Sequence, residues 1–219
     1  IGFCDNFLSN GQSAVWSKEG GLVDSLDNEN EGLLLYDTEL EKTEIWQPKI
    51  EVGQLKELAA IFQIYQNARQ DLKRKKVYQW IDDYPNIRTI ERDLQRGTLY
   101  VLKNANDIVG AISINEDQPL AYQLINWQFD ASKVLVIHRL AVEPKYQGKG
   151  YAQALMDFAE NFSLKNDYTS IRLDTYSQND RAIQFYEKRG YLTRGNVNFS
   201  GRTAPFYCME KDVRLLPKK

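Results

Sequence analysis

Apolar side chains recur every three or four positions after residue 54, which is the spacing of one buried helix face. The residues of this set are Leu55, Leu58, Ala59, Phe62 and Tyr65. We expect a long helix that ends in the basic run Lys73 to Lys76, because positive charge is favourable at a helix C-terminus. A shorter helix is expected around Ile90 to Arg96, where Gly97 stops it.

Shorter apolar runs between turn residues predict strands. The strands expected before residue 130 are Leu33 to Tyr36, Thr43 to Ile50, Leu99 to Lys103, Val109 to Asn115 and Ala121 to Phe129. The last three are separated by Asn-Ala-Asn-Asp and Glu-Asp-Gln-Pro, which are turn sequences. These three strands are therefore predicted to form an antiparallel meander.

The stretch Lys133 to Val142 is richer in apolar and β-branched residues, as expected of a strand that is covered on both faces. We expect it in the middle of the sheet. The later elements are a polar loop Glu143 to Lys149, a helix from Gly150 to about Lys165, a strand Ser170 to Thr175, a helix Asp180 to Arg189, and strands near Tyr191 to Arg194 and Phe206 to Val213. This mixture predicts a mixed α/β fold.

Acidic residues are concentrated at the start of the chain. Residues 1 to 51 contain 11 acidic and 3 basic side chains, whereas the remainder contains 19 acidic and 25 basic ones. We expect residues 1 to 42 to form an acidic extension of unassigned role and residues 43 to 219 to form one catalytic domain. The basic balance of this domain suits a polyanionic ligand, but ordinary solvated faces explain it equally well.

Several classes of protein are disfavoured by composition. The longest apolar stretches are far shorter than the roughly 20 residues needed to span a bilayer, and no secretion signal opens the sequence, so we expect a cytoplasmic protein without a membrane partner. Cys4, Cys208 and the single His138 match no metal spacing. No stacking aromatic pattern surrounds Lys73 to Lys76, so no nucleic-acid partner is expected.

The segment Gln147 to Ala152 lies between the expected central strand and the helix that follows it. Unpaired N–H groups and the helix dipole meet at such a position, which makes it an anion site. Gly148 and Gly150 would let an anion approach the backbone, and Lys149 adds positive charge. A flexible turn without a ligand is the alternative.

Spacing separates this loop from two other phosphate-binding patterns. The P-loop pattern fails because Gly150, not Ser or Thr, follows Lys149. A dinucleotide fingerprint fits better, with Gly148 and Gly150 present and Asp174 ending the next strand. Gln153, however, occupies the third glycine position, so this fit is weaker.

Two stretches together resemble the GNAT N-acetyltransferase superfamily. Arg139 to Val142 with Gln147-x-x-Gly150-x-Ala152 is similar to its acetyl-CoA motif, and Asn179-x-x-Ala182-x-x-Phe185-Tyr186-x-x-x-Gly190-Tyr191 is similar to a second conserved segment. The resemblance covers roughly residues 43 to 213. It implies a central, partly parallel sheet with helices on both faces, splayed at the strand Lys133 to Val142.

The resemblance also implies a reaction: transfer of an acetyl group from acetyl-CoA to a primary amine by direct attack in a ternary complex, without a metal. The Tyr186 hydroxyl would protonate the departing thiolate. The implied CoA-binding residues are Leu140, Ala141, Val142, Gln147, Gly148, Lys149, Gly150, Tyr151, Ala152, Asn179 and Tyr186. The acceptor would be a small-molecule or a protein amine, and a homodimer stays open.

The general base is less well defined. His138 is a catalytic candidate because of its intrinsic pKa, and Glu143 is a second one, but a structurally satisfied histidine is the alternative. Trp80, Tyr84 and Trp127 are candidates for the acceptor pocket, with a core role as the alternative. A non-catalytic acyl-CoA sensor, a dinucleotide-binding oxidoreductase and a pure interaction module remain the rival functions.

Overall fold

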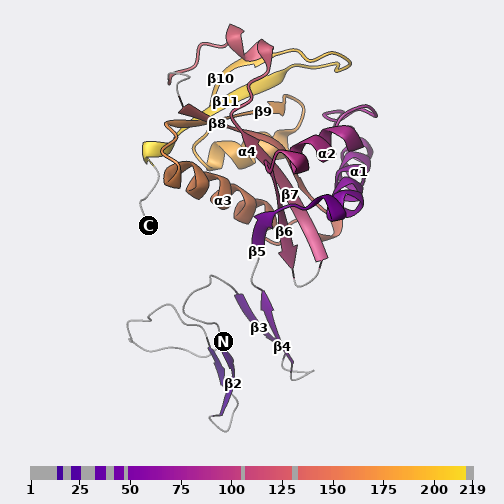
Figure 1. Cartoon of the computed structure of the whole chain (residues 1–219), viewed down its shortest axis with the longest axis vertical. Coiled ribbons are helices and arrows are strands. Elements are labelled where there is room, and N and C mark those ends of the chain that lie inside the picture. Colours follow the sequence, from indigo (N-terminus) through magenta and orange to yellow (C-terminus); the bar gives the residue numbers. More distant parts are fainter. Residues whose placement is uncertain are drawn as a thin grey trace. The chain divides into compact units, whose positions relative to one another are not determined.

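The computed structural model describes residues 14–16, 21–25, 33–37, 42–46, 49–104, 107–129 and 133–215 (Figure 1). Its contacts divide the chain into two units. The smaller contains residues 1–49 and 104–106, and the larger contains residues 50–103 and 107–219. Cys4 lies outside the described residues.

The smaller unit contains two antiparallel strand pairs. β1 (Ala14–Trp16) pairs with β2 (Leu22–Ser25), and β3 (Leu33–Asp37) pairs with β4 (Lys42–Trp46). The strand expected at Leu33 to Tyr36 is confirmed. The single strand expected from Thr43 to Ile50 is wrong, because β4 ends at Trp46 and a separate strand, β5 (Lys49–Val52), begins at Lys49.

The larger unit is built on a seven-stranded sheet with the strand order β10-β11-β9-β8-β7-β6-β5. Its other strands are β6 (Leu99–Asn104), β7 (Asp107–Asn115), β8 (Val134–Val142), β9 (Ser170–Tyr176), β10 (Leu192–Val197) and β11 (Phe206–Asp212). Its helices are α1 (Leu58–Arg74), α2 (Ile87–Gln95), α3 (Tyr151–Lys165) and α4 (Asp180–Lys188). The mixed α/β fold and the central position of β8 are confirmed.

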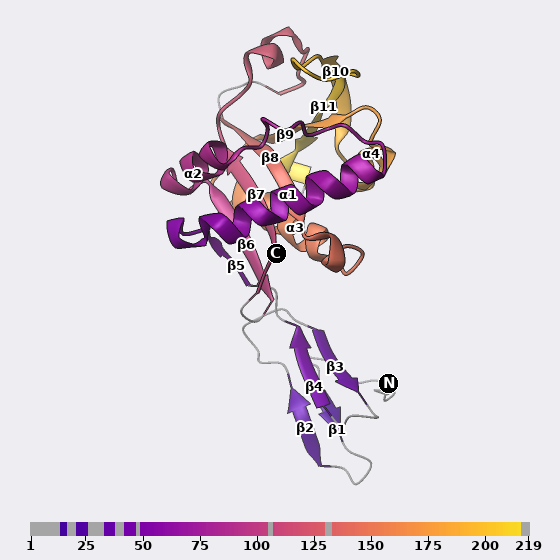
Figure 2. The same ribbon diagram turned by 90° about the vertical axis from the view of Figure 1, so that its right-hand side faces the viewer.

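Helices cover both faces of this sheet, and β7 shows the division because its side chains alternate between the faces. Ala111 packs in one core cluster with Ile61 and Ile90, from α1 and α2. A Cβ on the neighbouring Gly110 would lie 3.1 Å from Leu155 of α3 on the other face. Figure 2 shows α1 running across its face of the sheet.

The strand expected from Ala121 to Phe129 is wrong. Leu120–Leu124 form a 3₁₀ turn in which Tyr122 is buried. The backbone that follows bonds to a buried ion pair: Gln128 N–H donates to Glu210, and Arg172 donates to the carbonyl of Phe129. These bonds take the place of a strand ladder, and β7 pairs with β8 instead.

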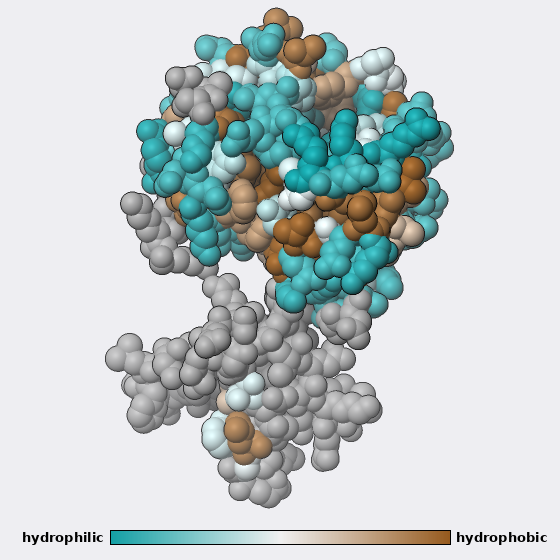
Figure 3. All heavy atoms as spheres, in the orientation of Figure 1, coloured by the Kyte–Doolittle hydropathy of each residue, from teal (hydrophilic) through white to brown (hydrophobic). Residues whose placement is uncertain are grey.

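On the face shown in Figure 3, polar side chains cover most of the larger unit and apolar ones form smaller patches between them. Among the described residues, no helix is long and apolar enough to cross a membrane.

Candidate active site

The two central strands of the sheet part from each other halfway along. β8 and β9 pair in parallel from Val134↔Ser170 to Ile137↔Leu173, where their register ends. Beyond that point β8 continues beside β7 up to Gly110↔Val142, and β9 continues beside β11 up to Phe206↔Tyr176. The backbone of residues 138–142 therefore borders an opening on the β9 side. This is the splay that the resemblance to the GNAT superfamily implied.

A β-bulge shapes β8 at this opening. Its register with β7 shifts between Ala111↔Ala141 and Ser113↔His138, so β8 contains one extra residue there. Arg139 has a φ of 41°, an uncommon conformation for a residue with a Cβ. The Tyr65 hydroxyl donates to the Arg139 carbonyl at 2.7 Å. The bulge therefore changes the direction of the main chain at the following residue, Leu140.

Side-chain bonds hold the bulge in place. The Arg139 side chain is 7% exposed, and its guanidinium forms an ion pair with Asp93 of α2, whose side chain is 2% exposed. It also donates to the Tyr84 hydroxyl at 2.8 Å and to the Ser113 hydroxyl at 3.2 Å. The ion pair with Asp93 offsets part of the positive charge that Arg139 brings to the opening.

An anion-binding loop lies between β8 and α3. Gly148 and Gly150 have φ values of 82° and 86°, and Gly150 is the N-cap of α3. A Cβ at either glycine would meet no atom within 4 Å, so the space beside the loop is open. Gln147 braces it by donating to the Val142 carbonyl at 3.3 Å and accepting from Arg181 at 3.2 Å. An open helix N-terminus flanked by cations favours a phosphate.

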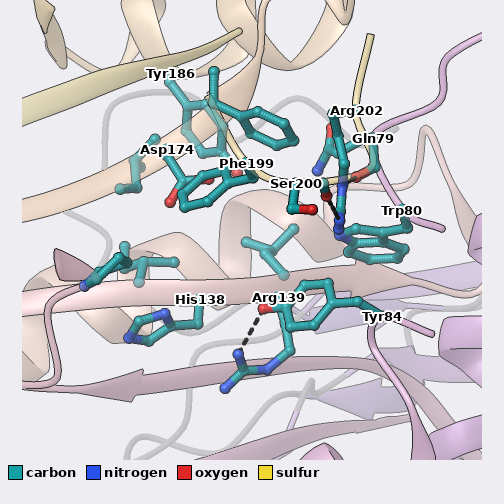
Figure 4. Close-up of a pocket in the computed structure, with 15 residues that line it drawn as sticks. Gln79, Trp80, Tyr84, His138, Arg139, Asp174, Tyr186, Phe199, Ser200 and Arg202 are labelled. Carbon is teal, nitrogen blue, oxygen red and sulfur yellow. Dashed lines mark hydrogen bonds between the residues drawn. The ribbon is translucent and has the colours of Figure 1, made fainter. Parts of the chain in front are cut away.

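A cavity of about 420 Å³ lies at the opening between the strands (Figure 4). Its walls come from β8, β9, α4, residues 79–84 and residues 199–206. Predicted site residues that line it are His138, Leu140 and Tyr186, and the predicted acceptor-pocket residues Trp80 and Tyr84 line it as well. The structure thus brings the candidate acid, the β8 main chain and two of the three predicted aromatics together.

Tyr186 and Asp174 have perturbed protonation in this cavity. Burial raises the pKa of the Tyr186 hydroxyl above its ordinary value, and the nearby charge of Asp174 raises it further. Burial also raises the pKa of Asp174 to about 6, although a 2.8 Å hydrogen bond from the Tyr122 hydroxyl opposes the shift. At neutral pH Tyr186 therefore keeps its proton, while Asp174 is mostly ionised and close to titration.

His138 is neutral at physiological pH. Burial and the charge of Arg139 lower its pKa to about 3. Its Nε2 lies 3.0 Å from Oδ1 of Asn115. A group with such a low pKa holds a proton weakly, so His138 suits contact with a substrate better than proton abstraction.

Other candidates from the sequence lie elsewhere or are already bonded. Glu143 accepts from the Asn67 amide at 2.9 Å and does not line the cavity. Trp127 packs on Tyr122 and under Arg172, which supports its alternative core role. Asn179 caps α4 by accepting from Ala182 N–H and donates to Gln79.

No metal site is apparent: no group of three or more His, Cys, Asp or Glu gathers among the residues that the structure describes. The thiol of Cys208 is buried, and burial raises its pKa to about 12, so it is not an activated nucleophile.

Sequence reasoning missed two charged residues of the cavity wall, Asp174 as part of the acceptor site and Arg202 altogether. An acidic residue between Leu173 and Thr175 in a strand expected inside the sheet was a signal for Asp174. No sequence signal pointed to Arg202, because it lies in the connection between β10 and β11, whose path over the cavity follows only from the fold.

The family model described as the acetyltransferase (GNAT) family matches residues 58–191, which is more than half of the chain. The chain is 25% identical over 129 residues to an uncharacterized N-acetyltransferase, YesJ, of Bacillus subtilis, covering 58% of this chain and 68% of that protein. It is 30% identical over 99 residues to streptothricin acetyltransferase of Escherichia coli, covering 45% of this chain and 49% of that protein.

A solved structure with the same fold contains a bound ligand. This is the PaiA N-acetyltransferase of Thermoplasma acidophilum in complex with coenzyme A. It aligns with a TM-score of 0.58 and 16% identity, covering 76% of this chain and 99% of that one. At this identity the likeness concerns the fold.

Replacing Gly150 by Ala should destabilise the protein by about 1 to 2 kcal/mol, because alanine is strained at a positive φ even where space is free. Urea unfolding measures the change. Gln153→Ala, at an exposed position of the same helix with no such constraint, is the matched control and should be nearly neutral. Equal stability of Gly150→Ala and the wild type would refute the left-handed turn at the start of α3.

Proposed function

The chain belongs to the acetyltransferase (GNAT) family, and from this premise we propose that it transfers an acetyl group from acetyl-CoA to a primary amine by direct attack in a ternary complex. The acceptor is a small-molecule or a protein amine. The observation that carries the proposal is the common location of the splayed strand β8 and Tyr186, which line one cavity.

The donor side of the proposal rests on the loop before α3. In it, the open backbone at Gly148 and Gly150 binds the pyrophosphate of CoA, with Lys149 nearby. The main chain of Leu140 to Val142, which β9 does not pair, binds the pantetheine amides as an added strand would. The PaiA enzyme, which has the same fold, forms a complex with coenzyme A, and this supports coenzyme A as the ligand of the opening.

Each step assigns one role to the protein. The neutral amine attacks the thioester carbon, and a main-chain N–H near the bulge at Leu140 stabilises the negative charge that develops on the carbonyl oxygen. The carbon–sulfur bond then breaks, and the Tyr186 hydroxyl gives its proton to the leaving sulfur. The proton that the new amide nitrogen sheds restores the tyrosine.

The raised pKa of Tyr186 agrees with this role, because a phenol that ionises only far above neutral pH is protonated whenever a thiolate departs. The acceptor amine, by contrast, is protonated at neutral pH and must lose a proton before it can attack. An alkylamine with a pKa near 10.4 is only about 0.04% neutral at pH 7, so a group in the cavity must accept a proton.

The test is a transfer assay that follows thiol release from acetyl-CoA and the mass of the product, with a panel of amines. We expect Tyr186→Phe to lower turnover by about 100-fold or more while CoA affinity changes little, because only the proton donor is lost. Tyr168→Phe, which removes the hydroxyl bonded to Glu116 on the surface, is the matched control and should keep full activity.

Two results would contradict the proposal in different ways. Unchanged turnover of Tyr186→Phe would remove this residue from the mechanism. CoA binding without acetylation of any amine by the wild type would instead point to a non-catalytic acyl-CoA sensor.

A further inference from the structure

Two side chains of opposite charge lie in the cavity wall, and the transfer chemistry described above uses neither. Asp174 is the first residue of β9 beyond its last pair with β8, so it lies at the point where the strands part. Arg202 belongs to the connection between β10 and β11. Figure 4 shows Asp174 on the Tyr186 side of the cavity and Arg202 on the side of Gln79 and Trp80.

Asp174 has one oxygen available for a ligand. Its Oδ2 accepts from the buried Tyr122 hydroxyl at 2.8 Å, which fixes the carboxylate. Its Oδ1 has no hydrogen bond with any described residue, and the side chain is partly exposed to the cavity. A carboxylate held at one oxygen and open at the other is a receptor for an ammonium group.

Arg202 is held in place by neutral groups. Its Nε donates to the Gln79 carbonyl at 3.3 Å and its Nη1 to the Ser200 carbonyl at 2.9 Å, and its guanidinium lies 5.6 Å from the centre of the Tyr84 ring. In the part of the chain that the structure describes, no carboxylate lies within ion-pair distance of Arg202, and its Nη2 has no hydrogen bond. Arg139, by contrast, is paired with Asp93.

The charges of Asp174 and Arg202 interact at a distance. Each contributes to the pKa of the other, yet Asp174 and Arg202 form no ion pair. The cavity thus offers an anionic and a cationic group at separate positions. Burial lowers the pKa of Arg202, as expected of a guanidinium whose lost hydration no counter-ion replaces. An acid group of a ligand would supply that counter-ion.

We propose that the acceptor is a small amino acid, with its ammonium group bound at Asp174 and its carboxylate at Arg202. This inference rests on the proposed function. One ammonium proton passes to Asp174 Oδ1, the N–H bond breaks, and the nitrogen lone pair becomes free to attack the thioester. Asp174 then releases its proton to solvent, while the leaving sulfur takes its proton from Tyr186. The net products are the N-acetyl amino acid, CoA and one proton.

The first test compares free amino acids with their carboxamides and with the corresponding decarboxylated amines, using acetyl-CoA and the thiol-release assay. We expect kcat/KM to be about 10- to 100-fold higher for the preferred amino acid than for its carboxamide, since a hydrogen-bonded charge contributes about 1.5 to 3 kcal/mol. Arg202→Gln should lower kcat/KM for the amino acid to about that for its carboxamide and so remove this preference, and Arg202→Lys should restore part of it.

The matched control is Arg214→Gln, which removes an exposed arginine that pairs with Asp212 near the end of β11. It should keep the wild-type preference. Equal rates for acids, carboxamides and amines, or a preference for acceptors without an acid group such as streptothricin, would overturn the inference while the proposed function stood. If the wild type acetylated no amine at all, this result would contradict the proposed function itself and not only the inference about its acceptor.

The second test is the pH profile of Asp174→Asn. The charged and titratable groups around Asp174 are Tyr122, Arg139, Tyr186, Arg202 and Cys208. Because a general base must be ionised, wild-type kcat/KM should rise as the pH passes through the Asp174 pKa of about 6.

The Asp174→Asn variant should lose this rise and about 100-fold or more in kcat. It should still gain thermal stability from CoA, which shows that it is folded. A variant that binds CoA and keeps both the rise and the rate would exclude Asp174 as the proton acceptor.

Discussion

The ion pair between Arg139 and Asp93 fixes the one irregularity on which the site depends. A regular β8 would continue its ladder on both sides and close the sheet. Instead, β8 carries an extra residue, and the bulge residue is held by Tyr65 at its carbonyl and by Asp93, Ser113 and Tyr84 at its side chain. These groups come from α1, α2, β7 and the connection between the helices. Both helices on that face therefore help to hold the strands apart.

In the proposed reaction, the opening would bind the donor through main-chain groups and the acceptor through side chains. On the donor side, the loop at Gly148 and Gly150 and the part of β8 beyond its last pair with β9 offer backbone groups, whose role does not depend on side-chain identity. On the acceptor side, the cavity offers fixed side chains with charge, Asp174 and Arg202. A fold with this division can keep one donor and change its acceptor by substitution in the cavity wall and in the connection over it.

Much of this arrangement could be predicted from sequence, because α1 and α3 have helical periodicity, β8 is a run of apolar and β-branched residues, and the glycine loop has strict conformational needs. The segment from Ala121 to Phe129 has strand-like composition, yet its backbone is bound by Arg172 and Glu210 from distant strands, a tertiary effect that local patterns do not contain. Asp174 and Arg202 could not be predicted as a pair for the same reason. They lie 28 residues apart in the sequence, and only the fold brings both into the wall of one cavity.

The central claim, that the opening between β8 and β9 receives acetyl-CoA, is tested most directly by thermal unfolding in the presence of acetyl-CoA, CoA, NAD and NADP. A ligand at 100 times its Kd stabilises the folded state by about 2.7 kcal/mol. We predict that acetyl-CoA and CoA raise the unfolding temperature and that NAD and NADP do not. A shift with NAD or NADP alone, or no shift with any of the four, would contradict the account.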